Sequence, residues 1–426
     1  MSAPRREVGA LDATLVTVGA MIGSGIFQTP AEVARRTGTL PRALLVWVLG
    51  AALSLLGALT LAEPGAALPG TGGLYVYLRR AFGARVAFLF GWAMLVVLVP
   101  SSVAFFAGVT ARHLAPVTRL DERVVSVAVI ALVAALNASG VRRAARAQSL
   151  TALAKCVGLA IAALAAFGAT PPVRVPASPT SASAMLAAVV PTLWAYDGWI
   201  DVTSIAGEVR DPGRTIPRAL VVGTLAVTAI YLLVVAGYHR ALGTAALAAA
   251  RAPGNALGAQ LAGAAGLRAM AALVTLSAFG GCVIAMLTGT RVIAATALDD
   301  DIAPSIGALG PRATPDRATA LTATLALAYA LSSHVGRLAE VFVVGAWPFY
   351  ALGALATIAL RRREPELPRP YRVPFYPWTA LAFFASTVAM LASFALEDAR
   401  LVAVSLALVL TGLPAYELAR RMLRRR

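Results

Sequence analysis

The stretch Gly19-Ala-Met-Ile-Gly23-Ser24-Gly25-Ile26-Phe27 lies in the middle of an apolar run, residues 12–36. A run of this length can cross a membrane as a helix. Each glycine lowers helix stability by about 1 kcal/mol relative to alanine, so this stretch predicts a break in the helix. Backbone that is not helical at membrane depth is tolerated only where it is buried in protein or lines a cavity. Close helix packing through Gly19-x-x-x-Gly23 is the alternative interpretation.

A second break is predicted in the apolar run 184–208. Its middle reads Pro191-Thr-Leu-Trp194-Ala-Tyr196-Asp197-Gly198-Trp199-Ile-Asp201. Aromatic, acidic and glycine residues in this order suit a lipid-facing helix poorly. The two breaks fall at corresponding positions of two halves with five apolar runs each. This pattern is typical of membrane proteins with an inverted repeat and a binding site near the middle of the membrane.

Apolar runs continue along the whole chain. Of its 426 residues, 59% are hydrophobic and 13% are charged, whereas a soluble domain has roughly 25% charged residues. Twelve runs are long enough to span a membrane: 12–36, 43–67, 84–110, 123–140, 148–168, 184–208, 218–239, 267–297, 318–335, 337–360, 377–396 and 400–418. We therefore predict an all-α membrane protein with 12 transmembrane helices in a single polytopic domain, residues 1–426. The first repeat covers 12–168, the second covers 184–360, and helices 11 and 12 cover 377–418.

The net charge of +17 indicates membrane topology. With an inward N-terminus, the predicted cytoplasmic segments hold 23 basic residues and the outer segments hold 12. This bias places both termini in the cytoplasm of a multi-pass protein of the plasma (inner) membrane. Nucleic-acid binding is the competing interpretation of a basic chain. It fails because the arginines are spread over alternate loops, so lipid is the expected macromolecular environment.

Lys155 is the only lysine of the chain, and it lies inside the apolar run 148–168. A charge at that depth costs roughly 2.5–3.5 kcal/mol, so the amine is expected to face a protein interior or a wet cavity. Buried lysine, unlike arginine, readily loses its proton. A side chain that reaches back to the membrane surface is the alternative interpretation.

The chemistry of the two breaks fits an amino acid. The freed N–H groups from Ser24 to Phe27 suit a carboxylate, because a helix N-terminus carries partial positive charge. The carbonyl groups that end the first half-helices suit an ammonium group; they belong to Met21, Ile22, Trp194 and Ala195. An α-amino acid presents both groups at this spacing. The rings of Trp194, Tyr196 and Trp199 are expected to limit the size of its side chain.

The stretch Gly19 to Phe27 resembles the first-helix signature of the amino acid–polyamine–organocation (APC) superfamily. The resemblance continues, in order, through 62–77, 81–92, 195–218, 288–304 and 369–374, and the branch that looks most similar is the L-amino acid transporter family with its bacterial relatives. It implies a leucine-transporter-type 5+5 inverted repeat with helices 1 and 6 unwound at mid-membrane. The candidate substrate-binding residues are then Met21, Ile22, Gly23, Ser24, Gly25, Ile26, Trp194, Ala195, Tyr196, Asp197, Gly198 and Trp199.

Two further expectations come from this resemblance. Lys155 matches a lysine whose amine, in this branch, occupies the place of a sodium ion, which implies transport without sodium. The resemblance also implies that this amine bridges the first break, near Gly19–Met21, to the run 267–297 near Ser277–Gly281. Eukaryotic members pair with a glycoprotein through a cysteine in the outer loop after the third helix. The corresponding segment, His113 to Arg123, has no cysteine. We therefore expect no disulfide-linked partner, and a monomer or weak homodimer.

The sequence thus predicts a secondary transporter of neutral L-amino acids that works by alternating access and is sodium-independent, either as an exchanger or coupled to protons. A carrier of cationic amino acids or polyamines is the alternative, favoured if Asp201 faces the cavity. Asp197 either caps the resumed helix or binds a proton or a cationic side chain. An intramembrane enzyme would need a nucleophile–base pair or metal ligands. The three histidines lie scattered near loops, so we predict no enzyme, no metal and no cofactor.

Overall fold

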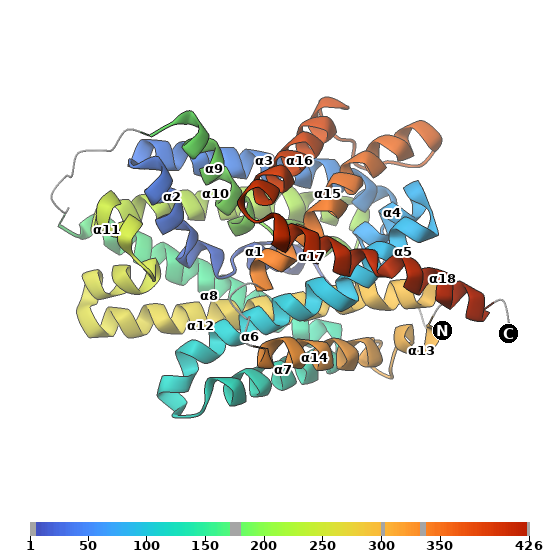
Figure 1. The fold of residues 1–426 in the computed structure, drawn as a ribbon, viewed down its shortest axis with the longest axis horizontal. Coiled ribbons are helices and arrows are strands. Elements are labelled where there is room, and N and C mark those ends of the chain that lie inside the picture. Colours follow the sequence, from blue (N-terminus) through green and yellow to red (C-terminus); the bar gives the residue numbers. More distant parts are fainter. Residues whose placement is uncertain (1–5, 171–179, 300–302, 333–337, 424–426) are drawn as a thin grey trace.

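The computed structural model describes residues 6–170, 180–299, 303–332 and 338–423, nearly all of them helical (Figure 1). The helices of the first half are α1 (Ala10–Met21), η1 (Gly25–Phe27), α2 (Thr29–Thr37), α3 (Leu40–Ala67), α4 (Leu74–Phe82), α5 (Ala84–Ala93), η2 (Met94–Leu98), α6 (Val99–Thr118), α7 (Glu122–Ala138) and α8 (Val141–Gly168). Those of the second half are α9 (Ala182–Ala195), η3 (Trp199–Glu208), α10 (Pro212–Leu242), α11 (Thr244–Ala249), α12 (Pro253–Leu298), α13 (Pro304–Gly307), α14 (Asp316–Leu331), α15 (Leu338–Arg363), α16 (Trp378–Glu397), α17 (Ala399–Leu410) and α18 (Gly412–Leu423). Among the described residues the only β pairing is one bridge, between Val8 and Val209.

Both glycine-containing stretches interrupt their helices. The chain leaves α1 at Ile22, passes through a 3-10 turn, η1, and resumes as α2. It leaves α9 at Tyr196 and resumes as η3, a 3-10 helix. The sequence predicted non-helical backbone at 22–25 and 195–198, and the structure has it at 22–24 and 196–198.

Eight helices of the described chain are long and apolar enough to cross a membrane. They are α3, the α5–α6 segment, α8, α10, α12, α15, α16 and the α17–α18 segment. Two other predicted runs are divided between shorter helices, α1 with α2 and α9 with η3. The runs 123–140 and 318–335 correspond to α7 and α14, which have 17 and 16 residues. Residues 333–337, where the predicted runs 318–335 and 337–360 meet, lie outside the described residues.

The interrupted helices lie at the centre of the bundle. Helix α1 packs against α8, α10, α12 and η3, and it is enclosed by them (Figure 1). Helix α3 packs along α10, and α6 packs along α12 with α7 and α14 outside it. Helices α16, α17 and α18 cover α3, α15 and α5. A polar site beside α1 is therefore enclosed by the neighbouring helices.

The segment between α5 and α6 is a turn of π-helix, η2. Pro100, the second residue of α6, has no N–H, so it leaves the carbonyl of Val96 without its usual helical donor. The hydroxyl of Tyr329, from α14, donates to that carbonyl at 3.0 Å. Single π-turns of this kind are frequent at functional sites. Both ends of η2, Met94 and Leu98, reach the central cavity.

Candidate functional site

Lys155 ties the end of α1 to α8. Its side chain is completely buried, with 0% of its surface exposed. The Nζ atom donates to the carbonyl oxygens of Gly19 at 3.1 Å and of Ile22 at 2.9 Å. These are among the last carbonyls of α1, which have no partner within the helix. The amine thus replaces the backbone donors that the interruption removes.

Helix α12 closes the other side of this contact. The hydroxyl of Ser277 donates to the carbonyls of Ile22 at 3.1 Å and of Gly23 at 3.0 Å. A Cβ atom on Gly280 would lie 3.0 Å from Nζ of Lys155, so this glycine makes room for the amine. Lys155 therefore lies between the first interruption and the Ser277–Gly281 segment, where the sequence placed it.

The two interruptions pack directly on each other. A Cβ atom on Gly25 would lie 2.9 Å from Cα of Ala195, and one on Gly198 would lie 2.8 Å from the carbonyl oxygen of Ala20. Gly198 also has a φ of +101°, which side chains disfavour. The hydroxyl of Tyr231 lies 2.9 Å from the carbonyl oxygens of both Met21 and Ala195. Glycine is needed here because two backbones touch.

Backbone donors are left free at the first interruption. Within the described residues, no hydrogen bond starts at the N–H groups of Ser24, Gly25 or Ile26. The N–H of Phe27, which we also expected to be free, donates to the carbonyl of Ser24 at 3.2 Å. Ser24 and Gly25 line a cavity, so three donors at the start of η1 remain for an anionic group.

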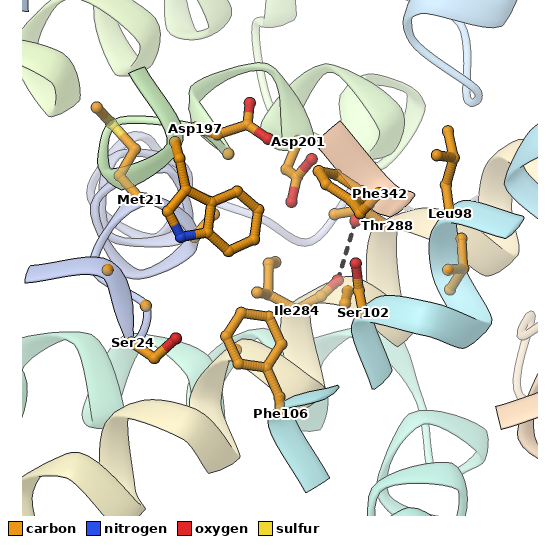
Figure 2. Close-up of a pocket in the computed structure, with 18 of the residues that line it drawn as sticks. Met21, Ser24, Leu98, Ser102, Phe106, Asp197, Asp201, Ile284, Thr288 and Phe342 are labelled. Carbon is orange, nitrogen blue, oxygen red and sulfur yellow. Dashed lines mark hydrogen bonds between the residues drawn. The ribbon is translucent and has the colours of Figure 1, made fainter. Parts of the chain in front are cut away.

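The cavity beside these donors has about 680 Å³ of space free of protein atoms, part of it open to solvent (Figure 2). Its lining includes eight of the predicted substrate residues: Met21, Gly23, Ser24, Gly25, Trp194, Ala195, Asp197 and Gly198. The other four predicted residues, Ile22, Ile26, Tyr196 and Trp199, are buried and outside this lining. Tyr196 packs against Trp47 and Tyr231, and Trp199 packs against Tyr350 and Phe383.

More than half of the wall comes from residues that the sequence did not single out as substrate contacts. Three segments supply most of them: η2 with α6, the middle of α12, and α15. The residues are Ala20, Met94, Leu98, Val99, Ser102, Phe106, Gly281, Ile284, Ala285, Thr288 and Phe342. Pro100 is a local sequence signal for the π-turn. Which faces of α12 and α15 line the cavity depends on helix packing, which the periodicity of the sequence does not reveal.

Two carboxyl groups reach this cavity. Asp197 is 9% exposed, and one of its oxygens accepts a hydrogen bond from the hydroxyl of Tyr350 at 3.2 Å. Asp201 lies on η3, one turn further along, and lines the cavity as well. Figure 2 shows its carboxyl group directed into the space beside Ile284 and Phe342. Asp201 therefore faces the cavity, which is the condition that favours a cationic substrate.

Trp194 separates this cavity from a second, larger space. It lines both, and its ring makes edge contacts with Phe105 and Phe342 at centroid distances of 6.3 and 6.2 Å. The second space has about 1250 Å³ free of protein atoms and lies along α2. Glu32 of α2 lines it and is hydrogen-bonded to Arg35 and Arg36.

A buried ion pair lies at the C-terminal end of η3. Glu208 binds Nε of Arg291, from α12, at 2.6 Å, and the two side chains are 5% and 3% exposed. The backbone N–H of Val8 donates to the carbonyl of Glu208 at 3.0 Å. Glu63 at the end of α3 is likewise bound by Arg361 and Arg369. These contacts give Glu63 a structural role at the end of α3.

A helical bundle with two interrupted helices beside a cavity that is mostly apolar and holds two carboxyl groups is typical of a membrane transport protein. The amino acid permease family model matches residues 8–412 of the chain. The chain therefore belongs to the amino acid permease family, in the L-amino acid transporter branch of the APC superfamily. Members of this family are transporters and not enzymes.

Three known proteins align with most of the length of this chain. The serine/threonine exchanger SteT of Bacillus subtilis is 30% identical over 422 residues, which cover 97% of this chain and 96% of that protein. The b(0,+)-type amino acid transporter 1 of Rattus norvegicus is 29% identical over 387 residues, covering 87% and 79%. The large neutral amino acids transporter small subunit 2 of Mus musculus is 29% identical over 433 residues, covering 97% and 80%. All three are amino acid transporters, which supports amino acid transport by this protein.

Proposed function

We propose that this protein is a secondary transporter that moves neutral L-amino acids by alternating access without sodium, either in exchange or together with protons. One observation carries the proposal: the amine of Lys155 holds the carbonyls of Gly19 and Ile22 at the end of α1. A cation covalently fixed at this place gives the interrupted helix the support that a bound sodium ion would otherwise supply. A transporter with its own cation at this place needs no sodium ion from solution.

The free donors of the first interruption would bind the substrate carboxylate. The N–H groups of Ser24, Gly25 and Ile26 start a helical turn, where partial positive charge favours an anion. A carboxylate that accepts two or three of these hydrogen bonds would be fixed in one orientation. Ser24→Leu would cover the donors and is expected to stop transport.

The substrate ammonium group needs different acceptors from those the sequence indicated. The carbonyls of Met21, Ile22 and Ala195 lie beside protein donors, from Tyr231 or from Lys155. The carbonyl of Trp194 accepts from the N–H of Asp197 at 3.2 Å. These four groups are therefore engaged.

Two acceptors remain at the cavity wall beside the interruptions: the carboxylate of Asp197 and the carbonyl of Ala20, which faces Gly198. The carboxylate of Asp201 lies further along η3. We propose that the Asp197 carboxylate and the Ala20 carbonyl bind the ammonium group. A charge-assisted hydrogen bond of this kind is roughly twice as strong as a neutral one, which suits a site that must hold a zwitterion away from water.

The architecture that we propose for this function has twelve membrane spans. It counts α1 with α2 and α9 with η3 as one interrupted span each, and α7 and α14 as short spans. Spans 1–5 and 6–10 then form a 5+5 inverted repeat in a single domain, with both termini in the cytoplasm and the protein in the plasma (inner) membrane. The matching interruptions at 22–24 and 196–198 support the repeat, and the basic residues support the orientation.

Alternating access would use barriers that lie on either side of the cavity. Trp194 with Phe105 and Phe342 separates it from the space along α2. The pair Glu208–Arg291 closes the other side. We propose that these barriers open in turn. Because the segment His113 to Arg123 has no cysteine, we propose that the protein has no disulfide-linked glycoprotein partner and is a monomer or weak homodimer.

A carrier of cationic amino acids or polyamines is a second candidate. Asp201 faces the cavity, and none of the described residues that line the cavity is basic. A positively charged substrate side chain would find an acceptor there, whereas a neutral one would not need it. The name of one relative, the serine/threonine exchanger, supports the neutral class instead.

Uptake into proteoliposomes tests the proposal. The purified protein should take up radiolabelled neutral L-amino acids in sodium-free choline buffer, and unlabelled substrate inside the vesicles or an inward proton gradient should stimulate uptake. Ser24→Leu should be inactive although it is inserted and monodisperse. Uptake that requires sodium, or normal uptake by Ser24→Leu, would contradict the proposal.

A further inference from the structure

The charges around the cavity do not balance when a neutral amino acid is bound. Among the described residues that line it, Asp197 and Asp201 are the only ones with charged side chains. A neutral amino acid brings one positive and one negative group, and its carboxylate would be held by uncharged N–H groups. Its ammonium group can then neutralise one of the two carboxylates. The second carboxylate is left without a counter-charge.

Asp201 is the carboxylate without a partner. Asp197 accepts a hydrogen bond from Tyr350, whereas within the described part of the chain no hydrogen bond or ion pair reaches the side chain of Asp201. An unpaired charge away from water costs several kcal/mol. The side chain faces open space and not a protein donor (Figure 2). Its partner must therefore come from the solution.

In the part of the chain that the structure describes, the groups around Asp201 offer no free cation. Lys155 of α8 is bound to the carbonyls of α1. Arg291 of α12 is bound to Glu208. Tyr350 of α15 donates to Asp197. Ser102 and Thr288 line the cavity, and the hydroxyl of Thr288 donates to Ile284 in its own helix.

We propose, on the basis of the function proposed above, that Asp201 is the charge-balancing residue of the substrate site. It carries a proton when a neutral amino acid is bound, and it binds the side-chain cation directly when the substrate is cationic. The proton comes from water on the side where the substrate enters, forms an O–H bond with the carboxylate, and is released with the substrate on the other side. The same site thus accepts both classes, and each substrate moves with one net positive charge.

This arrangement makes neutral and cationic uptake respond differently to pH. A neutral substrate needs protonated Asp201, so its uptake should fall as the external pH rises. A cationic substrate needs ionised Asp201, so its uptake should not fall as the external pH rises. At low pH its uptake should be inhibited. An inside-negative membrane potential should stimulate both.

The test uses the full-length protein in proteoliposomes. Initial uptake of radiolabelled L-serine and L-lysine is measured at external values of about pH 6 and about pH 8, on either side of neutrality. Each measurement is repeated with and without an inside-negative potassium diffusion potential. The parent is compared with Asp201→Asn, which cannot ionise, and with Asp201→Glu, which keeps the charge. Asp201→Ser serves as a second uncharged variant if the asparagine variant does not fold.

We expect the uncharged variants to lose L-lysine uptake by about tenfold or more, because a hydrogen bond to a charged group is removed. The pH dependence of L-serine uptake should disappear in the same variants, and Asp201→Glu should retain both properties. If the parent takes up amino acids but Asp201→Asn keeps its pH profile and its ratio of serine to lysine uptake, the inference is wrong and the proposed function stands. If the parent takes up no amino acid, both are wrong.

Discussion

Removal of the Lys155 amine is the perturbation with the clearest expected consequence. In Lys155→Ala, the carbonyls of Gly19 and Ile22 lose a charged donor at 3.1 and 2.9 Å. Hydrogen bonds to charged groups contribute about 1.5–3 kcal/mol each. Ile22 keeps the hydroxyl of Ser277 as a donor, so the loss of one full bond is the lower bound. With 1.4 kcal/mol per factor of ten, the loss of that one bond alone should lower uptake by about tenfold to a hundredfold, and the total loss should be at least this large.

Two further variants separate charge from volume. Lys155→Met keeps a long side chain without a donor, and it should be as impaired as the alanine variant. Lys155→Arg keeps the charge, but its guanidinium is larger and planar. The amine already lies 3.0 Å from the Cβ position of Gly280, so the larger group does not fit without a shift of α12. We therefore expect no rescue by arginine.

The assay is initial uptake of a neutral L-amino acid in sodium-free choline buffer, normalised to the amount of inserted protein. Size-exclusion profiles in detergent show whether each variant is folded. Full activity of Lys155→Ala or Lys155→Met would refute the supporting role of the amine. Sodium-driven uptake by the parent would refute the assignment of a fixed cation.

Three other variants probe the interruptions and the barriers. Gly25→Val should abolish uptake and lower the thermal stability in detergent, because its Cβ would lie 2.9 Å from Cα of Ala195; a fully active variant would show that the contact is not needed. Glu208→Gln leaves Arg291 buried without its counter-charge and should destabilise the protein by about 3–5 kcal/mol; the same variant combined with Arg291→Met should recover part of the melting temperature, and no recovery would argue against the pair. Trp194→Ala should increase the labelling of a cysteine introduced into the cavity by an impermeant thiol reagent added outside, and unchanged labelling would mean that another residue forms the barrier.

The interruptions could be predicted because their causes are local. Glycine disfavours helix wherever it stands, so Gly19 to Gly25 and Gly198 mark both breaks to within a residue or two. The position of Lys155 could be predicted for a similar reason. A single amine in an apolar run must find buried acceptors, and the carbonyls of an interrupted helix are the acceptors available.

The direction of side chains after each break could not be predicted. Tyr196 and Trp199 were expected to confine the substrate, but the structure packs Tyr196 against Trp47 and Tyr231, and Trp199 against Tyr350. The chain resumes there as a 3-10 helix, which turns side chains differently from an α-helix. The rings of Tyr196 and Trp199 therefore do not point where α-helical spacing would place them.

The far wall of the cavity depends on tertiary packing. Phe106, Ile284 and Phe342 come from three helices that carry no break or charge at these positions. An apolar residue in a membrane helix faces lipid, protein or a cavity according to how neighbouring helices pack. Only Pro100, which removes a backbone donor beside η2, gave a local sign that this segment is irregular.

A structure of the protein in lipid nanodiscs with a bound L-amino acid tests the account most directly. The account predicts the substrate carboxylate at about 3 Å from the N–H groups of Ser24, Gly25 and Ile26, as in an ordinary hydrogen bond. It also predicts the ammonium group beside Asp197, the side chain directed toward Asp201, and the amine of Lys155 still on the carbonyls of α1. An amino acid bound elsewhere, or a sodium ion at the first interruption with Lys155 displaced, would contradict it.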